Sequence, residues 1–261
     1  MPYITGSRLK VERASKHLEE LEREVRAFFD NNPYRPIRHV DPEDTRYFIY
    51  QFPPQPVPPL SLAVIVGDVV HNLRSSLDHI AWQLSLLTTS EPYKNTAFPI
   101  FKDTKPTSVT NFKRMTKDVL PDAIRVIEAL QPYHAGDTAE YTHLWILNSL
   151  WNTDKHRLLN AVPVRLTVPA FSGPDGSIRH LPDGATLMRI PKSAEPEKNL
   201  EPEIRREILF EIPGPAGRVN LALLGQIHHV VANEVIPLFA RFLLESGDRV
   251  DRRIGLAERQ R

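Results

Sequence analysis

The stretch that decides the fold is LSLAVIVGDVVHNLRSSLDHIAWQLSLL, residues 60–87. At about 100° per residue, its large apolar side chains fall on one arc, which predicts a helix with a buried core face. The members of that arc are Val66, Val69, Leu73, Leu77, Ile80 and Leu84. The apolar run at the start of this helix is too short to span a bilayer and is interrupted by Asp68, so we expect no membrane association.

Further periodic segments surround this helix in the sequence. They predict helices over residues 7–30, 108–118, 119–130, 143–159 and 219–246. Alternating segments predict a small antiparallel sheet, formed by residues 162–171, 186–191 and 207–213, which an earlier strand at 46–52 can join. In the last helix one side is expected to be buried: Leu224, Ile227, Val231, Val235, Leu238 and Phe242. The arginine-rich tail after Gly247 is expected to fray.

These elements predict a mainly α (α+β) fold in a single domain spanning residues 1–261. The helical bundle is expected to comprise residues 1–160 and 218–246, with the small antiparallel β-sheet inserted before the last helix, over about residues 162–213.

Composition excludes several classes of function. The chain has 33 basic and 32 acidic side chains, a net charge of +1, and so lacks the overall charge of a generic nucleic-acid binder. It contains no cysteine, which removes disulfides, thiol chemistry and cysteine-based zinc sites. The polar N-terminal stretch lacks the apolar core of a signal peptide, so we expect a cytoplasmic protein.

The remaining faces of the decisive helix are polar in an unusual way. Solvated helix faces favour Lys and Glu, yet neither occurs from Leu60 to Ser90. The polar side chains are short or planar and suited to hydrogen bonds, and they are His71, Asn72, Arg74, Asp78 and His79. Arg74 and Asp78, four residues apart, are placed to form a salt bridge. A solvated face, a structural hydrogen-bonded network and a functional site all remain open interpretations.

A second polar cluster follows in LNSLWNTDKHRLL, residues 147–159. Asn152 and Lys155 share a helical stripe, with His156 adjacent, and their donors suit a phosphate or carboxylate. The alternative is that these cations complement the C-terminal dipole of their helix. No HExxH spacing is present, so we expect no metal and no cofactor.

Four motifs in order, GDVVHNLRSSLDHIAWQL, FPIF, IEALQPYH and LWILNSLWNTDKHRLL, resemble a set of uncharacterised bacterial proteins over roughly residues 60–160. More widely, Arg74 followed by four residues and His79 resembles the hallmark of the HEPN superfamily. Its members are helical bundles, often dimeric, and catalytic members cleave RNA without metal at a dimer cleft. The resemblance implies that His79 is the general base on a ribose 2′-OH and that Arg74 stabilises phosphate charge. Catalytic members commonly have Asn, Asp or His after the arginine, whereas this chain has Ser75.

Three functions follow from these patterns. The first is a HEPN-like RNA-binding domain or metal-independent ribonuclease acting through Arg74 and His79. The remaining polar residues support it or bind phosphate: His71, Asn72, Asp78, Asn152, Lys155 and His156. The second is a non-catalytic HEPN-like interaction module, which pairs as a homodimer or binds another protein. The third is a bundle that binds a small anionic ligand.

Overall fold

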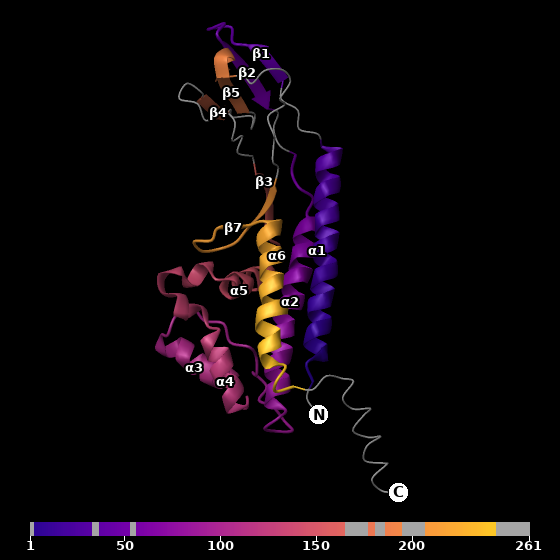
Figure 1. Cartoon of the computed structure of the whole chain (residues 1–261), viewed down its shortest axis with the longest axis vertical. Coiled ribbons are helices and arrows are strands. Elements are labelled where there is room, and N and C mark those ends of the chain that lie inside the picture. The colour runs from indigo at the N-terminus through magenta and orange to yellow at the C-terminus, as the bar shows by residue number, and fades with distance from the viewer. Residues whose placement is uncertain are drawn as a thin grey trace.

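The structure is a computed structural model that describes residues 3–32, 37–52, 56–164, 177–180, 186–194 and 207–243. Three long elements run side by side along its length (Figure 1). They are α1 (Thr5–Asn31), α2 (Ser61–Ser85) and α6 (Leu221–His229) with the helical turns that follow it. Shorter helices pack to one side, namely α3 (Pro106–Met115), α4 (Pro121–Ala129), the 3₁₀ segment η1 (Pro132–Tyr141) and α5 (His143–Asp154). The mainly α fold with a small β component is therefore confirmed.

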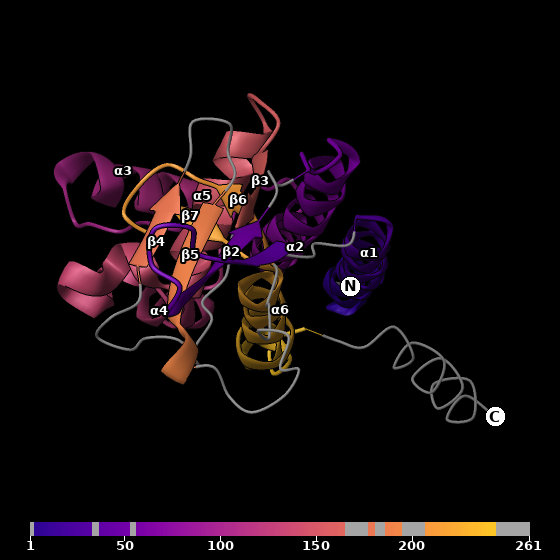
Figure 2. The same ribbon diagram turned by 90° about the horizontal axis from the view of Figure 1, so that it is seen from above.

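The core forms around α2, as its periodicity predicts. All six residues of the predicted arc are fully buried, and they pack in one hydrophobic cluster with residues of α1, α5 and α6. Viewed from above, α2 lies between α1 and α5, with α6 on a third side (Figure 2). One lengthwise face of α2 is left uncovered by these helices.

The strands form two antiparallel sheets rather than the single predicted insert. One is ordered β1-β2-β5-β4 and the other β3-β6-β7. The first contains β1 (Ile37–Val40), β2 (Tyr47–Phe52), β4 (Ser177–His180) and β5 (Thr186–Pro191). The second contains β3 (Asn160–Val164), β6 (Glu207–Glu211) and β7 (Arg218–Val219).

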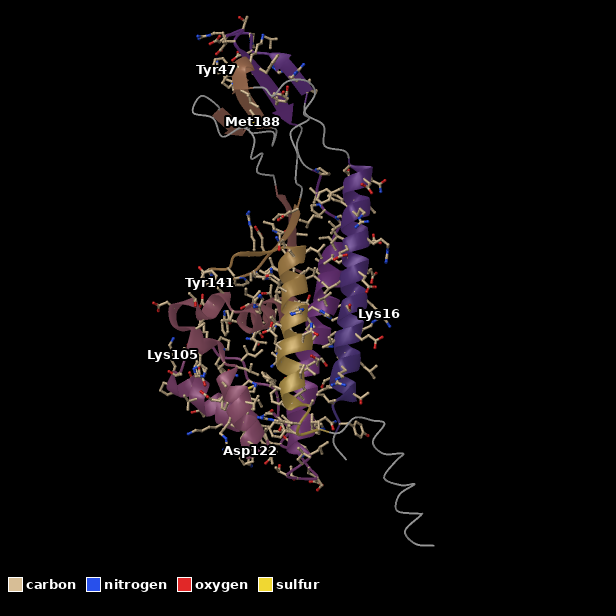
Figure 3. The ribbon with its side chains drawn as sticks, viewed as in Figure 1. Lys16, Tyr47, Lys105, Asp122, Tyr141 and Met188 are labelled. Atoms are coloured by element: carbon tan, nitrogen blue, oxygen red, sulfur yellow. The ribbon has the colours of Figure 1, made fainter. Side chains whose placement is uncertain are left out.

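The early strand β2 joins β5, with Tyr50 opposite Met188, as the sequence allowed. The prediction of one sheet was wrong because β5 does not pair with β3 or β6. The four-stranded sheet lies beyond one end of the bundle, where the side chains of Tyr47 and Met188 stand apart from those of the helices (Figure 3). The rest of the predicted insert and the tail after Gly247 lie outside the described residues.

The last helix is not one continuous α-helix. After His229 the chain adopts a π-helix, η4 (Val230–Val235), and then a 3₁₀ turn, η5 (Ile236–Phe239). Pro237 has no N–H to donate to the preceding turn, which explains the break in the α-helical ladder. The wider π turn shifts the buried face by one residue, so that Phe239 and Leu243 are buried and the predicted Leu238 is exposed.

A similar shift occurs at the end of α5. The helix was predicted to continue to residue 159 but ends at Asp154, and strand β3 begins at Asn160. Leu159 is therefore buried, while Leu158 is exposed. None of the helices in the described ranges combines the length and the apolar character needed to cross a membrane.

Candidate functional site

The guanidinium of Arg74 is enclosed by its own chain. Arg74 is only 3% exposed. One terminal nitrogen donates to Asp78 Oδ1 at 2.6 Å and the other to the carbonyl oxygen of Phe98 at 2.7 Å. Asp78 Oδ1 also accepts from the Phe98 N–H at 2.9 Å, which closes a ring of hydrogen bonds between α2 and the following loop. The predicted Arg74–Asp78 salt bridge is confirmed, and it fixes the FPIF segment against α2.

The indole of Trp151 on α5 completes this network. The Arg74 guanidinium carbon lies 4.9 Å from the ring centroid and the Lys155 Nζ lies 3.2 Å from it. Partial burial and the neighbouring charge of Arg74 lower the pKa of Lys155, against the opposing effect of Asp78. Lys155 is thus held by an aromatic ring rather than grouped with His156, and two cations share one indole.

His79 lies on another side of α2, beside α1. A Cβ built on Gly6 of α1 would lie 3.4 Å from its Nδ1, yet the imidazole remains solvent-accessible. Partial burial and the charge of Lys10 lower the pKa of His79, and Asp78 opposes them. Because five residues advance a helix by about 140°, Arg74 and His79 diverge, and one chain does not bring them together.

The end of α2 that faces Asp154 carries a third group of polar residues. Asn72 is buried and its side-chain amide donates to the Asp68 carbonyl oxygen at 2.8 Å, whereas His71 and Asp68 are exposed. The carboxylate of Asp154 packs directly on Gly67, where a Cβ would lie 2.5 Å from Oδ1. Burial and the like charge of Asp68 raise the pKa of Asp154, while His71 acts in the opposite direction.

The uncovered face of α2 is continuous along the helix, and we call it the α2 stripe. Its centre is polar and its two ends are apolar, with Val64 50% exposed and Trp82 41% exposed. It contains no lysine and no glutamate. Its members, all exposed or half-exposed, are Leu60, Val64, Asp68, His71, Ser75, His79 and Trp82.

The predicted cluster on α5 is divided by the structure. Asn152 and His156 face a hollow of about 420 Å³ between α5 and the turn that links β6 to β7, whereas Lys155 does not line it. Arg157 lines this hollow as well. Asn152 and His156 are therefore brought together on a surface separate from Arg74 and from the α2 stripe.

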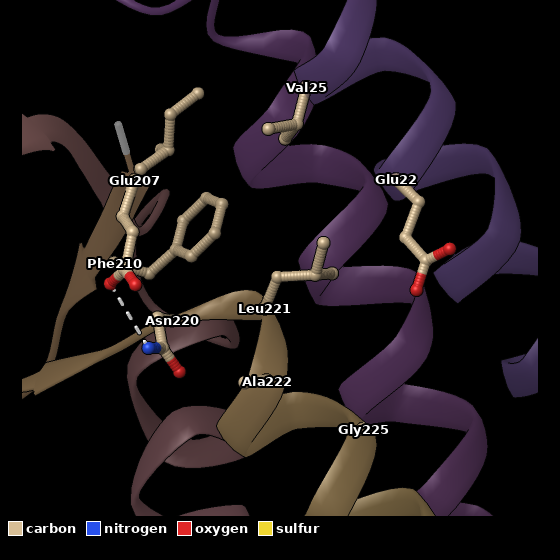
Figure 4. Close-up of a pocket in the computed structure, with 9 residues that line it drawn as sticks. Glu22, Val25, Glu207, Phe210, Asn220, Leu221, Ala222 and Gly225 are labelled. Carbon is tan, nitrogen blue, oxygen red and sulfur yellow. Dashed lines mark hydrogen bonds between the residues drawn. The ribbon is translucent and has the colours of Figure 1, made fainter. Parts of the chain in front are cut away.

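A second hollow, of about 430 Å³, lies between α1, β6 and the start of α6 (Figure 4). Phe210, Val25 and Leu221 give it an apolar lining, and Glu207 at its margin accepts from the side-chain amide of Asn220. It contains none of the predicted site residues. Among the residues that the structure describes, no three His, Asp or Glu side chains are grouped so as to hold a metal ion.

Two structural partners of the site were not identified from the sequence. They are Trp151, described above, and Gln131. Gln131 is buried, accepts from the Phe101 N–H at 3.0 Å and donates to the Pro99 carbonyl at 2.8 Å. A glutamine within the apolar motif IEALQPYH is the feature that would have indicated this role, because a buried amide needs partners.

Comparison with known proteins adds no assignment to this geometry. No protein-family model, no curated protein and no solved structure matches the chain.

Proposed function

We propose that this protein is a homodimeric helical interaction module in which two protomers pair through the α2 stripe, and that Arg74 is structural rather than catalytic. The observation that carries the proposal is the enclosure of Arg74. Its guanidinium is 3% exposed and donates to Asp78 and to Phe98. Presenting it to an RNA phosphate would require breaking a buried, charge-assisted hydrogen-bond network. This argument favours the non-catalytic interpretation of the HEPN resemblance.

The composition of the α2 stripe fits a protein interface better than a solvated face. Interface cores are enriched in aromatic residues and depleted of lysine and glutamate. Trp82 and Val64 expose apolar surface on a stripe that contains neither lysine nor glutamate. The burial of this surface would supply the hydrophobic contribution to association.

The stripe is also complementary to itself. Two copies of α2 packed antiparallel about a two-fold axis midway between His71 and Ser75 place Val64 opposite Trp82 of the other copy. In the same register His71 lies opposite Ser75 and Leu60 opposite Leu86. Because a two-fold interface repeats each contact, the contact between Val64 and Trp82 occurs at both ends of the interface and buries both apolar ends of each stripe. A second copy of this chain is therefore the occupant that the stripe fits.

Sedimentation velocity tests the proposal. The parent chain, of 29.8 kDa, is expected to sediment at twice that mass. Trp82→Glu should weaken the dimer by about 30-fold or more, the loss typical of an aromatic hot spot. Val109→Glu on α3 is the control, since Val109 is similarly exposed at 39% but lies outside the stripe. A monomeric parent, or a Trp82→Glu chain that dimerises as the parent does, would contradict the proposal.

Metal-independent RNA cleavage is the second candidate, and His79 is the observation that favours it. Its imidazole is accessible, and its lowered pKa keeps it neutral and able to accept a proton at neutral pH. In a nuclease with this geometry, His79 would act as the base without help from Arg74, which is enclosed. Incubation with total RNA compares the parent with His79→Ala, and cleavage that disappears in the variant would support the nuclease over the non-catalytic module. The cytoplasm, a reducing compartment, suits either function in a chain without cysteine.

A further inference from the structure

The hollow between α5 and the β6–β7 turn is built from side chains that converge from three parts of the chain. Trp145, Ser149, Asn152 and His156 follow one another at intervals of four, three and four residues and form one wall. The helix ends at Asp154, and the turn that follows brings Arg157 to the same hollow, with its N–H donating to the Thr153 carbonyl.

The opposite wall is a turn whose conformation is fixed by its backbone. The N–H of Ile212 donates to the Gly217 carbonyl oxygen at 3.0 Å, and the Gly217 N–H donates to the Gly214 carbonyl oxygen at 3.1 Å. Gly214 has a φ of 98°, which a residue with a side chain rarely adopts. Pro213 and Gly214 of this turn face the α5 wall across the hollow.

In the part of the chain that the structure describes, the charges around the hollow leave the positive charge of Arg157 without a counterion. Lys102 forms an ion pair with Glu140, so these two lining residues neutralise one another. His156 and Arg157 have no hydrogen-bond or ion-pair partner among the side chains of the described residues. An arginine that is not paired within its own chain is suited to bind a phosphate through two nitrogens at once.

The size and lining of the hollow indicate more than a bare anion. A volume of about 420 Å³ is within the range of sites for small organic ligands. The half-buried indole of Trp145 lines it, with the Lys102 Nζ 5.2 Å from the ring centroid, so a flat ring that stacks on the indole shares it with this cation. Ser149 and Asn152 add a hydroxyl and an amide, which can hydrogen-bond polar groups between the ring and the phosphate.

We propose that this hollow binds a small organic phosphate, with its phosphate on Arg157 and His156 and its ring against Trp145. The site is separate from the α2 stripe, since none of its lining residues belongs to the stripe. The inference is therefore independent of dimerisation, and either proposal can fail while the other holds. A purely structural role is the competing explanation, in which the two cations complement the C-terminal dipole of α5.

Isothermal titration calorimetry of the full chain with adenosine 5′-monophosphate as the probe tests the site. We expect binding that weakens with added salt, and weaker binding of both adenosine and inorganic phosphate. Arg157→Gln should weaken binding of the probe by about tenfold, the loss of one charge-assisted contact. Arg114→Gln on α3 removes the same charge from an exposed arginine elsewhere and should leave the affinity unchanged.

Four outcomes would overturn the proposal. They are no binding of the probe, binding of adenosine as tight as that of the probe, binding of inorganic phosphate as tight as that of the probe, and an unchanged affinity in Arg157→Gln. Circular dichroism of Arg157→Gln establishes that a lost affinity does not reflect unfolding. His156→Gln is the second variant: a reduced affinity supports the placement of the phosphate on His156, whereas an unchanged affinity contradicts it.

Discussion

Replacement of Arg74 by methionine tests whether its role is structural. Methionine keeps much of the volume of the side chain but donates no hydrogen bond, so the buried Phe98 carbonyl loses a partner. Asp78 loses its countercharge but keeps the Phe98 N–H, and its side chain is 29% exposed, so water replaces part of the loss. Breaking a buried pair costs about 3–5 kcal/mol, and the partial exposure of Asp78 places this case at about 3 kcal/mol.

Urea unfolding followed by circular dichroism measures this change in the free energy of unfolding. His79→Ala is the matched control from the same helix, and we expect its effect to stay within about 0.5 kcal/mol because the imidazole is accessible. In the Arg74→Met background, Asp78→Asn should cost less than it does alone, since no buried charge is left unpaired. A loss below about 1 kcal/mol for Arg74→Met would refute the argument that this arginine holds the FPIF segment on α2.

Three further predictions concern neighbouring residues. Asp154→Asn should raise the free energy of unfolding at pH 7, because a raised folded-state pKa means that the ionised carboxylate destabilises the fold as the pH rises. The effect should disappear below about pH 4, where the carboxyl is protonated in both the folded and the unfolded chain. Thermal melts across this range check it, and equal stability of the variant and the parent at pH 7 would contradict it. Gly67→Ala should destabilise the parent by about 1 kcal/mol, because its Cβ would lie 2.5 Å from Asp154 Oδ1. In an Asp154→Ala chain the same substitution should be stabilising, because alanine has the higher helix propensity. A change in the free energy of unfolding that has the same sign in both backgrounds, measured by urea unfolding, would contradict this reasoning. Gln131→Leu should cost about 2–4 kcal/mol, because it leaves the Phe101 N–H and the Pro99 carbonyl without partners; a loss under about 1 kcal/mol in the same assay would count against it.

Local periodicity explains why so much of the helical architecture was predictable. The buried arc of α2 follows from spacing alone, and the Arg74–Asp78 bridge follows from an interval of four residues. Departures from α-helical geometry were not predictable in the same way. The π-helix Val230–Val235 moves the residues that follow it by one position, which is why Phe239 rather than Leu238 reaches the core.

Long-range pairing limited the prediction of the sheets and of the site. Nothing in residues 47–52 indicates that their partner strand is residues 186–191. For the polar residues of α2, the sequence left a solvated face, a structural network and a functional site open, because spacing on one helix does not reveal its neighbours. The loop at Phe98 and the indole of Trp151 enclose Arg74, whereas the side of α2 beside α1 leaves His79 accessible.

Disulfide trapping tests the antiparallel pairing of the α2 stripe most directly, because the natural chain contains no cysteine. One chain carries His71→Cys and a second, tagged chain carries Ser75→Cys, the two positions that face each other across the proposed axis. Mild oxidation of the mixture is expected to give mainly the disulfide-linked heterodimer, since bridged Cα atoms must lie within about 7 Å. A mixture that stays monomeric, or that links each chain to its own kind as readily as to the other, would contradict the proposed interface.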